Sequence, residues 1–124
     1  MTEVIVNAGS CGFTATVVVT KGAEGFRISI SSDCEAVRTW GDHLQPLSLS
    51  EILNPQKVLR FYESVLCHIQ HVACPVPLTV IKAIEVEAGA ATARDVSIHF
   101  ISQGQKNLEG EAGDGFGRQK KGNT

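Results

Sequence analysis

Hydrophobic and polar residues alternate along three segments in the first third of the chain, and this pattern predicts three β-strands. Residues 2–7 form a short β-prone segment, residues 13–20 place threonines on one parity and apolar side chains on the other, and residues 26–31 alternate large apolar with polar side chains. The glycine-containing stretch 21–25 has a length suited to a hairpin loop. We therefore expect an antiparallel pair formed by residues 13–20 and 26–31.

Apolar positions recur at helical spacing through the middle of the chain. Ser32 and Glu35 have the spacing of a capping box, which marks the start of a helix. Pro75 suits the first turn of another helix, and Gly89 suits its end. The expected helical segments are residues 32–43, a short capped turn at 48–53, residues 57–72, and a last helix from about residue 74 to Gly89.

Alternation returns at residues 96–101, which predicts a last strand. Glycine and mixed charges dominate residues 103–124, so we expect a disordered tail there. The prediction is thus a single α+β domain over residues 1–102. Its order is three strands, three helices and a strand, with the helices packed on one face of a small antiparallel sheet.

The charge and composition of the chain mainly exclude classes of partner. The chain has 124 residues, a formal net charge of −2 and 19% charged residues without a basic patch, so neither nucleic acid nor an anionic membrane is expected as a partner. We expect no secretory signal in residues 1–7, which have no basic segment and no long apolar run, and no apolar run approaches the ~20 residues of a membrane-spanning helix. We expect a cytoplasmic protein, in which cysteines serve as metal ligands or reactive thiols rather than as disulfides.

The residues best suited to chemistry are crowded between Cys67 and Pro77, where two of the four cysteines and two of the four histidines lie. Cys67, His71 and Cys74 have the spacing i, i+4 and i+7, which on a continuous helix places all three on one face. Such a face suits a metal or redox site.

The other two cysteines lie where a backbone can present a thiol. Cys11 is in a Gly-Ser-Cys-Gly turn, and Cys34 falls in the first turn of a predicted helix, where amide groups and the helix dipole favour a thiolate. Zinc or an iron–sulfur cluster takes about four soft ligands from separate segments. The predicted metal ligands are Cys11, Cys34, Cys67 and Cys74, with His71 as a substitute.

Simpler roles stay open for several of these residues. The chain has no Cys-x-x-Cys motif, and Cys67 also fits as a small apolar residue of the helix core. His43 and His99 are assigned to the surface, and His68 to solvent or to the helix end.

A thiol nucleophile is the alternative to a metal site. Cys74 pairs in sequence with His71 and begins a helix, which suits a thiol or persulfide carrier or a redox protein. No third orienting residue is evident, so the sequence predicts no catalytic set and favours a protein that is not an enzyme. An oligomeric domain whose cysteines only pack is the third hypothesis, and a protein partner is expected but not identified.

The arrangement of the cysteines resembles the TSCPD-type four-cysteine domain, over about residues 7–87. Gly9-Ser10-Cys11 matches the first turn of that family, Cys34 its second cysteine, and Cys67 with Cys74 its last pair, which has six residues between the two cysteines. Val76 stands where that family has aspartate. The resemblance implies metal binding through the four cysteines as one set.

Two weaker resemblances concern shorter motifs. Cys11-Gly12 is similar to the first motif of the U-type iron–sulfur scaffold proteins, although Phe13 replaces the acidic residue of that motif. Cys74-Pro75-Val76-Pro77 is similar to the Cys-Pro-x-Pro motif of small sulfur-carrier proteins. These motifs imply cluster or persulfide chemistry at the same cysteines.

Overall fold

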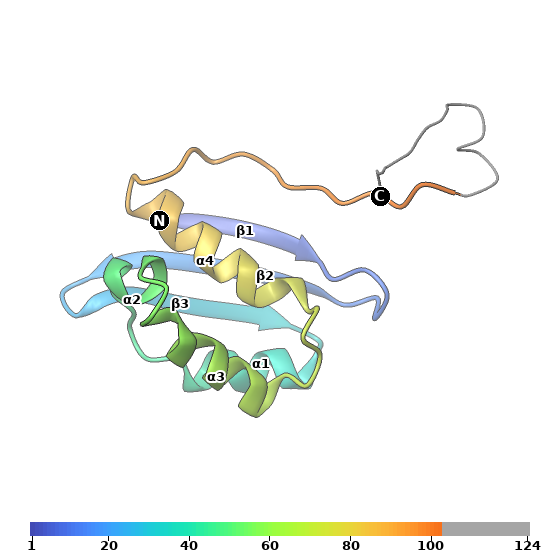
Figure 1. The fold of residues 1–124 in the computed structure, drawn as a ribbon, viewed down its shortest axis with the longest axis horizontal. Helices are drawn as coiled ribbons and strands as arrows, with labels where there is room; N and C mark the ends of the chain where they lie inside the picture. Colours follow the sequence, from blue (N-terminus) through green and yellow to red (C-terminus); the bar gives the residue numbers. More distant parts are fainter. Residues whose placement is uncertain (103–124) are drawn as a thin grey trace. The chain divides into compact units, whose positions relative to one another are not determined.

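The computed structural model describes residues 1–102, and all helices and strands of this part lie in the unit Met1–Ala93 (Figure 1). The α+β prediction is confirmed. The elements, in chain order, are β1 (Thr2–Asn7), β2 (Thr14–Gly22), β3 (Gly25–Ser32), α1 (Glu35–His43), α2 (Leu49–Leu53), α3 (Val58–His68) and α4 (Pro75–Glu87).

The three strands form an antiparallel sheet in the order β1-β2-β3, with Val17 of β2 paired to Val4 on one side and to Ile30 on the other. The predicted hairpin is present, but its pairing continues to Gly22 and Gly25, so the loop is shorter than the five residues expected. Gly25 has φ +128°, and a Cβ there would lie 2.9 Å from the carbonyl oxygen of Leu47. Only glycine fits this close approach.

The helices cover one face of the sheet, as predicted (Figure 1). Helix α4 lies over β1 and β2, whereas α1 lies over β3 and also packs against α3. Alternate residues of β2 face this helical layer and are buried, while the other face of the sheet carries mostly polar side chains together with Ile5 and Val18. The core consists of Ala15, Val17, Val19, Phe26, Val37, Trp40, Ile52, Phe61, Val65, Ile69, Val76, Val80, Ala83 and Ile84.

One predicted helix start and one predicted helix end differ from the structure. Ser32 does not form a capping box with Glu35; its hydroxyl oxygen accepts the backbone N–H of Cys34 at 3.1 Å, and Cys34 is the N-cap of α1. A true capping box stands at Ser48, which begins α2. Helix α3 ends at His68 rather than near residue 72, because Ile69 turns into extended backbone and is buried in the core.

The expected strand at residues 96–101 is absent, which corrects that prediction. Residues 94–102 contain no helix or strand, and Ile98 and Phe100 are 80% and 97% exposed. A strand is stable only when its backbone pairs with a neighbour and one face is buried, and this segment has neither. The predicted tail at 103–124 lies outside the described residues. Among residues 1–102, no helix is long and apolar enough to cross a membrane.

Candidate functional site

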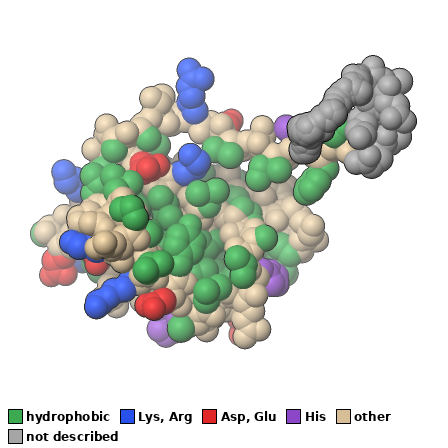
Figure 2. All heavy atoms as spheres, in the orientation of Figure 1, with side chains coloured by type: hydrophobic (Ala, Val, Ile, Leu, Met, Phe, Trp, Pro, Cys, Tyr) green, Lys and Arg blue, Asp and Glu red, His purple; other side chains and the backbone are tan. Residues whose placement is uncertain are grey.

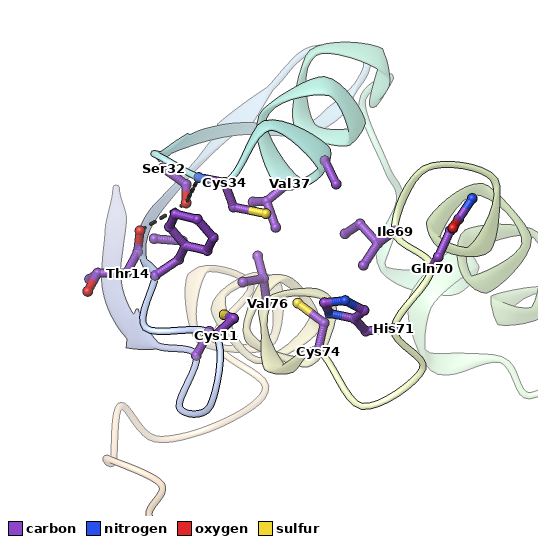
Figure 3. Close-up of a pocket in the computed structure, with 14 residues that line it drawn as sticks. Cys11, Thr14, Ser32, Cys34, Val37, Ile69, Gln70, His71, Cys74 and Val76 are labelled. Atoms are coloured by element: carbon purple, nitrogen blue, oxygen red, sulfur yellow. Dashed lines mark hydrogen bonds between the residues drawn. The ribbon is translucent and has the colours of Figure 1, made fainter.

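Three of the four cysteines line one small pocket near the start of α4. Its volume is about 70 Å³, and its wall is mostly apolar. Cys11, Cys34 and Cys74 come from three separate segments of the chain and surround this pocket (Figure 3). The remaining lining residues are Ala8, Phe13, Thr14, Ala15, Ser32, Ala36, Val37, Ile69, Gln70, His71 and Val76.

Cys74 is the N-cap of α4 and is half-buried. Pro75 follows it in the first turn, where a missing N–H costs nothing. Burial raises the pKa of the Cys74 thiol, and a hydrogen bond from the backbone N–H of Val76 partly opposes that rise. Negative charge on Cys34 and Cys11 raises the pKa further, so the net shift is upward. The neighbouring cysteines therefore oppose ionisation of Cys74.

Cys34 is the N-cap of α1 and is also half-buried. Ser32 holds the turn that carries it, because the Ser32 hydroxyl accepts the N–H of Cys34 and donates to the carbonyl of Thr14 at 2.9 Å. These bonds tie the start of α1 to β2. Two of the pocket cysteines, Cys34 and Cys74, are thus N-caps of helices.

Cys11 is exposed in the loop between β1 and β2. Gly9 and Gly12 on either side have positive φ angles of 84° and 78°, and the N–H of Gly12 donates to the carbonyl of Gly9 at 2.8 Å. This tight turn places Cys11 at the rim of the pocket (Figure 3). The two glycines near Cys11 therefore determine the shape of its loop.

His71 lies at the rim on the opposite side, in the turn between α3 and α4. The backbone carbonyl of His71 accepts the N–H of Cys74 at 3.3 Å. Because α3 ends at His68, the expected single helical face formed by Cys67, His71 and Cys74 does not exist, and that prediction is wrong.

Cys67 is exposed on α3 and lines neither this pocket nor the adjacent one. It also does not belong to the buried core, which was its simpler predicted role. The spacing between Cys67 and Cys74 could not predict that they lie apart, because their separation depends on where α3 ends.

A second, more open pocket of about 420 Å³ adjoins the first. The two share Ala8, Cys11, His71 and Cys74, so these residues face both an inner apolar cavity and solvent, while Cys34 lines only the inner one. The sequence pattern does not predict the apolar wall of the inner pocket, which includes Phe13 and Val76.

The donor types around the pocket suit a soft metal, since three thiols and an imidazole form a Cys₃His set. In this conformation, however, these donors are not placed close enough together to coordinate one metal ion. Among residues 1–102, no group of three or more His, Cys, Asp or Glu side chains could hold a metal ion. All four cysteines are free thiols.

Residues 2–100 match the sequence model of one family, DUF6951, which is described as a family of unknown function. No curated protein and no solved structure matches the chain. The resemblances to the TSCPD, iron–sulfur scaffold and sulfur-carrier proteins therefore stay predictions.

Proposed function

Because the chain belongs to DUF6951, a family of unknown function, we propose a function from its own pocket: binding of a soft metal centre, zinc or an iron–sulfur cluster. The donors are Cys11, Cys34 and Cys74, with His71 as the fourth. The observation that carries this proposal is that three thiols from three distant segments line one pocket of about 70 Å³. In a cytoplasmic setting these thiols stay reduced.

The electrostatics of the pocket support a cation. The pKa of Cys74 is raised by burial and by the neighbouring Cys34 and Cys11, so its thiolate is favoured only when a positive charge is nearby. A metal ion supplies that charge, and a coordinating thiol is deprotonated.

The proposed ligand set replaces Cys67 by His71, because His71 lines both pockets and Cys67 lines neither. Cys11 and His71 are both exposed and stand on turns between secondary-structure elements. They are therefore the donors whose side chains can rotate toward Cys34 and Cys74, which sit at fixed helix starts.

Elemental analysis of protein purified without oxygen tests the proposal. We expect about one zinc or one cluster per chain in the wild type. We expect loss of most of that metal in Cys11→Ser, Cys34→Ser and Cys74→Ser. Cys67→Ser is the matched control, since it removes a thiol outside the pocket, and it should keep the wild-type metal content. Absence of zinc and iron from the wild type would contradict the proposal, as would equal metal loss in Cys67→Ser.

A thiol or persulfide carrier centred on Cys74 is the second candidate. Its support is the N-cap position of Cys74 and the open pocket that Cys74 lines. The raised pKa of Cys74 opposes it, because a carrier thiol must ionise readily near neutral pH. We therefore rank it below metal binding.

A further inference from the structure

We propose that His43 and His68 form a separate binding site for a divalent transition metal such as Ni²⁺, independent of the thiol pocket. The two imidazole rings, one on α1 and one on α3, lie next to each other with centroids 4.8 Å apart and planes tilted by 38°. Neither residue lines either cysteine pocket. The proposal goes beyond the proposed function and does not depend on it.

The backbone selects the tautomer of both rings. The Nδ1 atom of His43 lies 2.8 Å from the carbonyl oxygen of Thr39, and Nδ1 of His68 lies 3.0 Å from that of Ser64. A carbonyl oxygen only accepts, so each Nδ1 carries the proton and donates. In the neutral rings, both Nε2 lone pairs are therefore left for a ligand. Metal-bound histidines commonly use this arrangement, with the second ring nitrogen donating to a carbonyl.

Helices α1 and α3, which carry the two histidines, pack against each other (Figure 1). The indole N–H of Trp40, a fully buried residue of α1, donates to the hydroxyl oxygen of Ser64 on α3 at 3.1 Å. That hydroxyl in turn donates to the carbonyl of Phe61 at 2.7 Å, and the rings of Trp40 and Phe61 pack edge to face. Ser64 thus links α1 to α3 and also anchors His68. The ring pair is a consequence of fixed helix packing.

The site is open and has two protein ligands. His43 is exposed and His68 is half-buried, and within residues 1–102 no third His, Cys, Asp or Glu completes a cluster with them. Water molecules fill the remaining coordination positions of a metal such as Ni²⁺, for which imidazole is a suitable ligand. Binding is accordingly weaker and faster to exchange than at a site with four protein ligands.

Ni²⁺ titration followed by amide NMR spectra tests this proposal, because bound paramagnetic Ni²⁺ broadens nearby resonances. We expect broadening centred on the last turns of α1 and α3. We expect His43→Gln and His68→Gln each to weaken this binding by roughly tenfold or more, the range seen when a metal site loses a supporting group. His99→Gln is the histidine control, since His99 is exposed in the other unit, and Cys74→Ser is the thiol control.

Wild-type amide spectra in both glutamine variants, recorded without metal, establish that they are folded. Unchanged Ni²⁺ affinity in either glutamine variant would overturn the proposal, because it requires both rings. Broadening confined to the residues around Cys11, Cys34 and Cys74 would also overturn it. Retention of the α1 and α3 signals in Cys74→Ser supports a site independent of the thiols.

Discussion

At the scale of single residues, burial and the neighbouring backbone shift the pKa of the Cys74 thiol in opposite directions. Its half-buried position disfavours the thiolate, while the backbone N–H of Val76 favours it, and burial dominates. Cys67 differs on every count, since it is exposed and lies outside the pocket. Position in the fold, rather than the sequence neighbours of each cysteine, separates their chemistry.

This difference predicts the order of thiol reactivity in metal-free protein. Because alkylation requires the thiolate and the pKa of Cys74 is raised, Cys74 should react with iodoacetamide more slowly than Cys67 at neutral pH. The rate of Cys74 should reach its plateau at a pH above the ordinary range of a cysteine thiol. Peptide mass spectrometry over a pH series measures both rates. Faster labelling of Cys74 than of all other thiols would instead favour the carrier hypothesis.

At the scale of elements, the sequence predicted the strands and the last helix because their signals are local. Alternation across 13–20 and 26–31, and the proline start of α4, each depend on a few neighbouring residues. The end of α3 could not be predicted in this way, since it depends on burial of Ile69 in a core built by distant elements. The alternation at 96–101 was misleading, because a pattern that suits a strand does not supply a partner for it.

The site was predictable to the same limited extent. The sequence predicted one set of four cysteines, and three of them, Cys11, Cys34 and Cys74, line one pocket. The separate place of Cys67 and the contact of His43 with His68 were not predicted, because both depend on where α3 ends and how it packs on α1. Packing between elements is the information that the sequence pattern lacks.

The contact between α1 and β3 yields a stability prediction. A Cβ added at Gly41 would lie 3.1 to 3.3 Å from three side-chain carbons of Ile30. We expect Gly41→Ala to lower the free energy of unfolding by about 1–3 kcal/mol through overpacking, less the ~1 kcal/mol that alanine returns in helix propensity. Asp42→Ala, at the next position of α1 and exposed, is the control and should change stability little. Urea unfolding measures both, and a stabilised Gly41→Ala would show that α1 and β3 have room to separate.

At the scale of the unit Met1–Ala93, helix α4 is anchored at both ends. Cys74 at its start faces the thiol pocket, whereas Glu87 at its end accepts a hydrogen bond from the Thr2 hydroxyl at 2.6 Å and pairs with the α-ammonium group of Met1 at 3.1 Å. These interactions hold the pKa of Glu87 below its usual range. Between these ends, Val80, Ala83 and Ile84 of α4 are buried. Figure 2 shows that other hydrophobic side chains reach the surface on one face of the molecule. The position of Cys74 is therefore tied to the packing of the unit as a whole.

Cobalt substitution tests the central claim most directly, because thiolate ligands produce a charge-transfer absorption whose intensity rises with the number of thiolates bound to Co²⁺. We expect reduced, metal-free protein to show this band on titration with Co²⁺, and Cys67→Ser to retain its full intensity. Cys11→Ser, Cys34→Ser and Cys74→Ser should each lose about a third or more of it, since each removes one of three thiolate ligands. No band in the wild type, or a loss in Cys67→Ser equal to that in Cys74→Ser, would contradict a metal centre held by the three pocket cysteines.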